Sequence, residues 1–303
     1  MPTQRQPIAI FGGTGHYGRE IVRHLVRSSV PVRVLSRDAA SAKALLGPQV
    51  EIVEGDVTSR ETARRMLAGS SGVVVSLSAV NPRQIRQMKQ IERDAVLMIL
   101  EEMERAGISN LVYISVYDIR DELLERLRIR KLADIKIEVE QRIKESGLGW
   151  AILGCPPSYE LFFALLRGDK LIAPGGGRRA IACISSKDVG AIAAQVAVSS
   201  RWKGRRIRLC GPEAVNFPEV ARKISGHTGR KVRVLAVPLR LVNVLSFLAL
   251  PFSPFLRFIY YSLKMMNNFP EDLAAKVPED HAWLREQFDY EPVSLEEEIG
   301  RRG

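Results

Sequence analysis

A glycine-rich turn stands between a short apolar run and a helical segment, and its residues are Gly12, Gly13, Thr14, Gly15, His16, Tyr17 and Gly18. Its first, fourth and seventh residues are the glycines spaced three apart. In this pattern the first glycine permits a tight turn, the second lets a ligand approach the backbone, and the third lets helix and strand pack closely. The start of the following helix would offer free N–H donors to phosphate. The turn therefore predicts a dinucleotide pyrophosphate site, with an ordinary glycine-rich loop as the alternative.

The end of the second predicted strand bears on which dinucleotide binds. NAD-binding domains usually place an acidic residue there, about 20 residues beyond the glycines, to bind the ribose hydroxyls. This chain has Ser36 and Arg37 instead. A guanidinium pairs well with a 2′-phosphate, so the sequence favours NADP(H) over NAD(H) as the cofactor. Two alternatives stay open: Arg37 is simply solvated, or the neighbouring Asp38 binds the ribose.

Short apolar runs alternate with helical patterns along the first half of the chain. Such continuous apolar strands are typical of a parallel sheet that is covered on both faces. This indicates an α/β fold with a Rossmann-type doubly wound parallel sheet, which binds ligands at the carboxyl ends of its strands. The predicted strands are 8–11, 32–35, 50–53, 73–76, 111–115 and 150–153, and the main predicted helices between them are 20–27, 84–105 and 134–145.

That scaffold assigns further residues to the cofactor. Asp56 and Val57 follow the third strand, where a carboxylate could accept a hydrogen bond from the adenine amino group; capping of the next helix is the alternative. A thiol at Cys155 is more often a small buried residue than a reactive group. The remaining expected positions are Ser76, Leu77 and Ser78 beside the nicotinamide ribose, and Gly154, Cys155 and Pro156 along the nicotinamide ring.

The second half has a less regular pattern, with a Pro-Gly-Gly-Gly turn at 174–177. We expect a dinucleotide-binding domain over 1–155, to which 179–210 returns a strand, and a smaller, mainly helical C-terminal substrate lobe formed by 156–178 and 211–303. Helices are predicted at 158–166, 186–198 and 217–228. Tyr159, Phe162 and Phe163 belong either to the substrate cleft or to the core of the lobe.

Taken together, these motifs resemble the atypical short-chain dehydrogenase/reductase group, in particular the NmrA-like and isoflavone-reductase-like proteins. The similarity covers nearly the whole chain. It begins with GGTGHYG, VLSRD, EGDV and VYIS, continues with IKIEVEQRIKESGLGWAIL, and ends with the looser ISSKDVGAIAA and LCGPEAVNFPEVARKISGHTGRKVRV. The group more often has an arginine where Gly154 stands.

Lys136 aligns with the active-site lysine of that group, which positions the cofactor or takes part in proton transfer. Its ammonium could donate to the nicotinamide ribose, and we expect burial or nearby positive charge to lower its pKa. The alternative is a helix-surface lysine that pairs with Glu140, four residues further on.

The chain departs from the group's usual pattern at Leu132. Most short-chain dehydrogenases carry a proton-donating tyrosine there, and leucine cannot donate a proton. Ser115 matches the group's serine and could bond a substrate oxygen, or it could bond its own backbone. We do not expect Tyr117 to replace the missing donor, and Tyr113 is expected in the core.

Two functions from different classes follow. The first is an NADP(H)-dependent reductase for an apolar carbonyl, enone or quinone-like small molecule, with Lys136 and Ser115 at its polar end. The second is a non-catalytic NADP(H)-binding redox sensor or assembly protein of the NmrA-like type, which the missing tyrosine leaves open.

Composition narrows the partners. The 303 residues carry a formal charge of +11, with 46% hydrophobic residues, which suits a globular α/β protein. No zinc-finger spacing or other nucleic-acid signature occurs, the four histidines suggest no metal site, and we expect no nucleic-acid partner. Three separate cysteines and the lack of a signal-peptide pattern predict a cytoplasmic protein.

The segment 239–263 is almost entirely apolar, and Pro251 and Pro254 divide it into two pieces too short to span a bilayer. Three interpretations stay open: two helices that roof the substrate pocket, a homodimer interface, or peripheral membrane contact, which the basic charge would support.

Overall fold

The computed structural model describes residues 5–118, 120–130 and 133–302. Its main sheet has seven parallel strands in the order β10-β6-β5-β4-β1-β2-β3. Because the chain leaves β1 toward one edge and returns beside β1 at β4, the sheet is doubly wound, as predicted. The strands are β1 (Ile8–Phe11), β2 (Val32–Ser36), β3 (Glu51–Glu54), β4 (Gly72–Val75), β5 (Asn110–Val116), β6 (Gly149–Cys155) and β10 (Arg205–Arg208).

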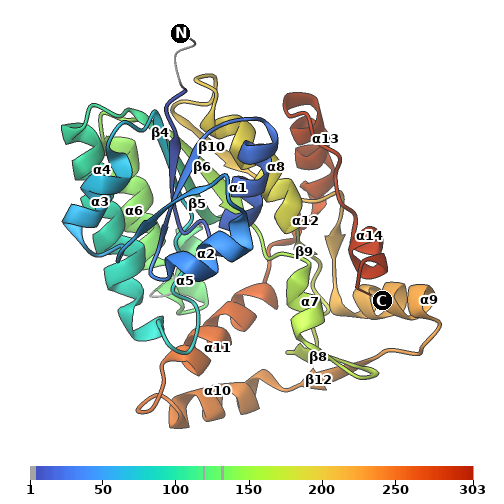
Figure 1. Ribbon diagram of the computed structural model, residues 1–303. Helices are drawn as coiled ribbons and strands as arrows, with labels where there is room; N and C mark the ends of the chain where they lie inside the picture. Colours follow the sequence, from blue (N-terminus) through green and yellow to red (C-terminus); the bar gives the residue numbers. More distant parts are fainter. Residues whose placement is uncertain (1–4, 119, 131–132, 303) are drawn as a thin grey trace.

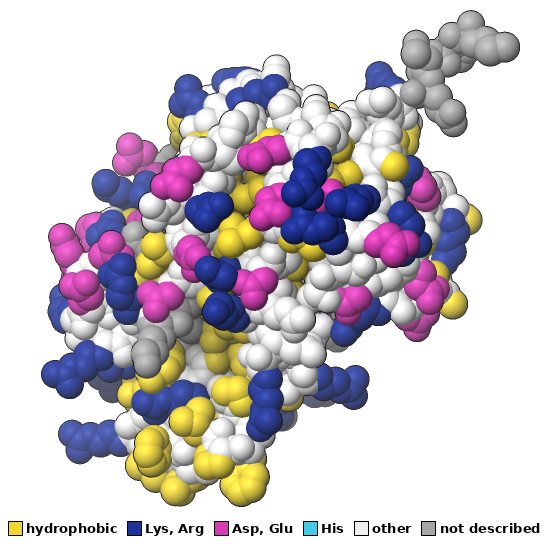
Figure 2. Space-filling view, turned by 90° about the vertical axis from the view of Figure 1, so that its left-hand side faces the viewer, with side chains coloured by type: hydrophobic (Ala, Val, Ile, Leu, Met, Phe, Trp, Pro, Cys, Tyr) yellow, Lys and Arg dark blue, Asp and Glu magenta, His cyan; other side chains and the backbone are white. Residues whose placement is uncertain are grey.

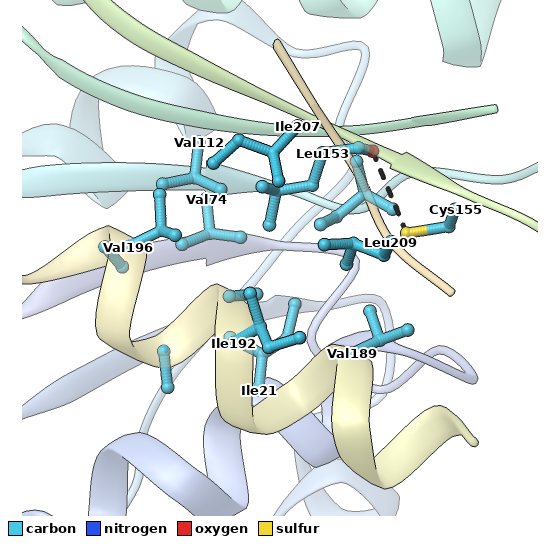
Figure 3. Close-up of a cluster of buried hydrophobic side chains, with 14 of the residues drawn as sticks. Ile21, Val74, Val112, Leu153, Cys155, Val189, Ile192, Val196, Ile207 and Leu209 are labelled. Atoms are coloured by element: carbon cyan, nitrogen blue, oxygen red, sulfur yellow. Dashed lines mark hydrogen bonds between the residues drawn. The ribbon is translucent and has the colours of Figure 1, made fainter. Parts of the chain in front are cut away.

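Helices cover both faces of this sheet (Figure 1). One face carries α1 (Gly18–Arg27) and α8 (Ser186–Ala197), and the other carries α3 (Arg60–Leu67), α4 (Ala95–Arg105) and α6 (Asp134–Glu145). Figure 3 shows Val189, Ile192 and Val196 of α8 facing the strands. Burial on both faces explains why the strands are almost uniformly apolar.

The second half forms two further small sheets, in which strands predicted at 170–173, 181–184 and 231–237 take part. β7 (Leu166–Arg167), β8 (Lys170–Pro174) and β12 (Arg233–Val237) form a three-stranded sheet, and β9 (Ile181–Ala182) pairs with β11 (Ala214–Val215). Tyr159 and Phe162 are fully buried among these elements and form the core of the lobe, so they are not cleft residues. The remaining helices are α2 (Ala39–Leu46), α5 (Asp121–Arg126), α7 (Glu160–Ala164), α9 (Phe217–Thr228), α10 (Leu239–Leu248), α11 (Phe255–Met266), α12 (Glu271–Ala275), α13 (Val277–Gln287) and α14 (Leu295–Gly300).

Two predicted helices are shorter than their sequence pattern. The segment predicted as one helix over 84–105 consists of a 3-10 turn (Ile85–Gln87), a π-helical turn (Gln90–Asp94) and then α4. The prediction over 158–166 was also too long, because α7 ends at Ala164 and Leu166 pairs with Leu171 in β7 and β8.

The predicted division of the chain into two domains stays a prediction. Strand β10 does return to the main sheet. Leu273, Val277 and Leu284, from α12 and α13, pack in the core beneath that sheet. Within the described ranges, no helix is both long and apolar enough to cross a membrane.

Candidate active site at the carboxyl edge of the sheet

The glycine turn has the conformation that its spacing predicts. Gly12 has φ of +87°, and a Cβ at Gly12 would overlap the carbonyl oxygen of Ser76. A Cβ at Gly18 would overlap the backbone of Gly12, so neither position accommodates a side chain. Among the backbone N–H groups of the turn, those of Thr14, His16 and Tyr17 donate no hydrogen bond within the described chain. They lie just before α1, where free N–H groups bind phosphate oxygens.

A groove of about 680 Å³ runs from this turn across the ends of β2, β3 and β4. Gly13 and Gly18 belong to the turn but do not line the groove, and Gly13 packs against Val34. The predicted residues that line it are Gly12, Thr14, Gly15, His16, Tyr17, Ser36, Arg37, Asp56, Val57, Ser76, Leu77 and Ser78.

Arg37 and Asp38 differ in their hydrogen bonds to other residues of the protein. Asp38 caps α2, since its two carboxylate oxygens accept from Ser41 N at 2.9 Å and from Ser41 Oγ at 2.6 Å. These hydrogen bonds also hold the pKa of Asp38 below its usual value. Arg37 is exposed in the groove and makes no hydrogen bond or ion pair within the described chain. A cation is thus available in the groove at the end of β2.

Asp56 is not a helix cap. Its Oδ1 accepts from Thr58 N at 2.8 Å and from Thr58 Oγ1 at 2.6 Å, which lowers the pKa of Asp56. The cap of α3 is Ser59 instead, whose hydroxyl accepts from Thr62 N. The helix-cap interpretation of Asp56 is therefore wrong, and its carboxylate lies in the wall of the groove.

Two side chains of the turn connect it to the segment after β6. His16 Nε2 lies 2.9 Å from Ser158 Oγ, and Tyr17 Oη donates to Pro156 O at 2.9 Å. Glu160 lies beside His16; burial opposes its ionisation, but hydrogen bonds to His16 and Ser186 lower its pKa to about 2. The helix end of the turn is thus fixed against α7.

A second, apolar cavity of about 370 Å³ adjoins the groove. Tyr17, Ser76, Leu77 and Ser78 line both spaces, so a ligand in the groove could extend to the cavity. One wall comes from α11, through Phe258, Ser262, Met265 and Met266, and the polar side chains on the opposite side include Glu92, Ser115 and Lys136.

Lys136 lines the cavity, and only 14% of its side chain is exposed, so it is not a helix-surface lysine. Its Nζ lies 2.9 Å from Glu92 Oε2 and donates to Tyr113 Oη at 3.2 Å. Burial opposes the charge, but Tyr113 and Glu92 outweigh burial and raise the pKa of Lys136. The expectation of a lowered pKa is wrong, because the nearest charge is a carboxylate. The alternative, a surface lysine paired with Glu140, is wrong, since Glu140 bonds Ser115 and Arg206.

Ser115 bonds a side chain and not its own backbone. Its Oγ donates to Glu140 Oε1 at 2.6 Å, and Arg206 Nε donates to Glu140 Oε2 at 2.9 Å. Arg206 also donates to the carbonyl oxygens of Val116 and Tyr117. With its proton directed at Glu140, the Ser115 hydroxyl can accept a hydrogen bond in the cavity but is not free to donate one.

The end of β6 is only partly placed as expected. Cys155 and Pro156 line the cavity, whereas Gly154 does not. A Cβ at Gly154 would lie 2.7 Å from Tyr117 O and 3.0 Å from Nη1 of Arg206. A guanidinium therefore lies beside the position where the related group more often carries an arginine. Figure 3 shows Cys155 within a cluster of buried hydrophobic side chains. Burial raises the pKa of Cys155 to about 12, which disfavours the reactive thiolate.

Tyr117 lines the cavity but is a poor candidate for the missing proton donor. Only 5% of its surface is exposed, and its Oη has no hydrogen-bond partner within the described residues. Burial raises its pKa. The position of the usual tyrosine, Leu132, lies outside the described residues.

Sequence reasoning missed the segment after β4. Gln84, Gln87 and Gln90 line the groove, while Met88 and Glu92 line the cavity. The available signal was Glu92 itself, a carboxylate at a buried helix position. Within the described chain, no group of three or more His, Cys, Asp or Glu side chains could hold a metal ion.

Comparison with known proteins identifies the family of this chain. The NmrA-like family model matches residues 4–297. The chain belongs to the NmrA-like family. Among curated relatives, this NmrA-like chain is 27% identical to the NAD(P)H azoreductase of Xenophilus azovorans, over 77% of each chain. It is 21% identical to the photosystem II assembly factor Ycf39 of Trieres chinensis, over 79% of this chain and 74% of that one.

Solved structures share the fold. The Escherichia coli NADPH-dependent quinone oxidoreductase QOR2, in complex with NADPH, has a TM-score of 0.71 at 19% identity, and covers 97% of this chain and 99% of its own. The Citrobacter triphenylmethane reductase, in complex with NADP(H), has a TM-score of 0.74 at 18% identity, with the same coverage.

Proposed function

We propose that this protein is an NADP(H)-dependent reductase of apolar carbonyl, enone or quinone-like small molecules. The observation that carries the proposal is the apolar cavity, which contains Lys136 and adjoins the dinucleotide groove at Tyr17 and the segment 76–78. An enzyme requires such an open space beside the nicotinamide, whereas a pure sensor has no need of one.

The groove fits NADP(H) in both charge and shape. The free N–H groups of the glycine turn suit the pyrophosphate, and the unpaired Arg37 suits a 2′-phosphate. Asp38, the alternative ribose ligand, is already engaged with Ser41. When bound, NADPH supplies a hydride from its nicotinamide ring.

The protein's own groups provide position and charge. Lys136 stays protonated, and an ammonium has three N–H donors. Glu92 and Tyr113 take two of them, so the third can donate to a ribose hydroxyl or to an oxygen of the substrate. The apolar walls from α11 exclude water and favour an apolar substrate.

The names of similar proteins agree with this class. The azoreductase, the quinone oxidoreductase and the triphenylmethane reductase are all named as reductases, two of them for NADP(H) complexes or NADPH dependence. We therefore include azo and triphenylmethane dyes among the compounds to test.

The second candidate is a redox sensor or assembly protein. Leu132 in place of the tyrosine favours it, as does the similarity to Ycf39. The two functions differ in turnover, because a sensor binds NADPH without oxidising it.

The test is NADPH oxidation with a panel of quinones, enones, aldehydes and dyes, followed by the loss of nicotinamide absorbance. The reductase predicts turnover with at least one apolar acceptor and its loss in Lys136→Met. Tight NADPH binding without turnover across the panel would replace the reductase with the sensor.

A further inference from the structure

The helix α10, the turn that follows it and the first turn of α11 expose an apolar surface. Phe252 is 82% exposed, Phe247 is 65% exposed and Leu248 is 64% exposed, which is unusual for large apolar side chains. We call this surface the apolar tip, and its residues are Leu241, Val244, Leu245, Phe247, Leu248, Leu250, Phe252 and Leu256.

The orientation of α10 is the reverse of that of a normal surface helix. Its two uncharged polar residues face the protein: Ser246 is buried, and Asn243 Oδ1 accepts from Arg257 Nη1 of α11 at 2.6 Å. The Arg257 guanidinium also lies 4.6 Å from the centre of the Tyr261 ring. A helix that hydrogen-bonds inward and presents leucine and phenylalanine outward is built to place its apolar face in something other than water.

The surroundings of the tip are basic. From residue 220 to residue 270 the sequence contains no aspartate or glutamate. Arg240 lies within α10, and Arg86 donates to Phe252 O at 2.7 Å. Figure 2 shows the hydrophobic side chains gathered at the lower end of the molecule, where Lys and Arg side chains flank them and Asp and Glu side chains lie above.

We propose that the apolar tip docks on an anionic lipid bilayer surface, independently of the reaction in the cavity. Apolar side chains would enter the boundary between headgroups and acyl chains, while Arg86 and Arg240 would meet anionic headgroups. A second copy of the chain is the weaker occupant, because a symmetric dimer through the tip would bring the same cations together. The contact is peripheral, since no helix within the described ranges could cross a bilayer.

The test is co-sedimentation of the full chain with vesicles of equal parts phosphatidylglycerol and phosphatidylcholine, compared with phosphatidylcholine alone. We expect binding to the anionic vesicles at low salt and weaker binding as salt is raised. The double variant Phe247→Glu/Phe252→Glu should stay in the supernatant. The control Val198→Glu, which places the same charge at another exposed apolar residue, should bind like the wild type. Arg240→Gln should weaken binding by about fivefold, the usual contribution of one basic residue near such a surface.

Three outcomes would overturn membrane docking through the apolar tip. It is overturned if the wild type stays in the supernatant with anionic vesicles, or if the double variant binds as well as the wild type. It is also overturned if light scattering shows a dimer that the double variant dissociates while vesicles bind neither form. Because both phenylalanines are exposed, the unfolding midpoint of the double variant should equal that of the wild type, which separates lost docking from lost folding.

Discussion

The ammonium of Lys136 lies 2.9 Å from the carboxylate of Glu92 in the wall of the cavity, where Glu92 is buried and only 14% of the Lys136 side chain is exposed. Glu92 also accepts from Ala79 N at 2.7 Å, just beyond Ser78 in the groove wall. The pair therefore fixes both the lysine and the backbone that follows β4.

The ion pair between Lys136 and Glu92 should contribute measurably to the free energy of unfolding. Glu92→Gln keeps an acceptor for Ala79 N–H but leaves the Lys136 charge unpaired, so we expect a loss of about 3 kcal/mol in the free energy of unfolding. Lys136→Met should cost a similar amount, and the double variant should lose clearly less than the sum. Urea unfolding of the cycle measures this. Strictly additive losses would show that the two charges do not stabilise each other. The exposed Arg130, replaced by methionine, serves as the control and should change stability by less than about 1 kcal/mol.

Gly154 should not tolerate a side chain. A Cβ there would press on Tyr117 O and on the guanidinium of Arg206, so Gly154→Ala should destabilise the fold by about 1–3 kcal/mol. Gly147→Ala is the matched control, since nothing lies within 4 Å of its Cβ position. Equal thermal midpoints for the two variants would contradict the packing described for Arg206.

Removing the hydroxyl of Tyr117 should be harmless. Its Oη is buried without a partner in the described part of the chain, so Tyr117→Phe should leave the free energy of unfolding unchanged or raise it by up to about 1 kcal/mol. Reductase turnover should stay within about twofold, because the hydroxyl is not expected to donate a proton. A large fall in turnover with intact folding would instead identify Tyr117 as the donor that replaces the missing tyrosine.

Asp188 predicts a pH dependence of stability. Burial, aided by Glu297, raises its pKa from the ordinary 3.8 to about 7, although Val293 N–H donates to it. In the unfolded chain the carboxyl ionises near its ordinary pKa, so unfolding releases a proton between pH 3.8 and about 7. The contribution of Asp188 to stability is therefore fully present below the lower pH and is lost as pH rises toward the higher one.

The variant that checks this is Asp188→Asn, which cannot ionise. Its unfolding free energy relative to the wild type should rise from pH 4 to pH 7 and then level off, since the wild type alone loses stability there. A difference between the two proteins that does not vary with pH would rule out a raised pKa at Asp188.

The fold was predictable where the structure requires a particular type of residue at a position. The glycine turn is one example, because a side chain at Gly12 or Gly18 would overlap the backbone. The strands of the main sheet are a second example, since their two buried faces require apolar residues throughout. The segment 84–94 has no such requirement: its helical periodicity does not distinguish 3-10, π and α turns, which depend on how the segment packs over the groove.

The site was predictable in its location but not in its pairing. The positions of Lys136 and Ser115 at the sheet edge follow from the strand order. Their partners do not, because Glu92 and Glu140 reach them through tertiary packing rather than helical spacing. The i+4 spacing suggested Glu140 as a possible partner of Lys136, but in the structure Lys136 pairs with the buried carboxylate of Glu92.

We infer that the groove binds NADP(H) and that Arg37 recognises its 2′-phosphate. The most direct measurement is the affinity for NADPH and for NADH of the wild type, of Arg37→Ala and of the remote control Arg167→Ala. We predict that the wild type and the control prefer NADPH, and that Arg37→Ala weakens NADPH binding by about 10- to 100-fold while leaving NADH binding unchanged. Retention of the NADPH preference in Arg37→Ala, or equal affinity of the wild type for the two cofactors, would contradict the account.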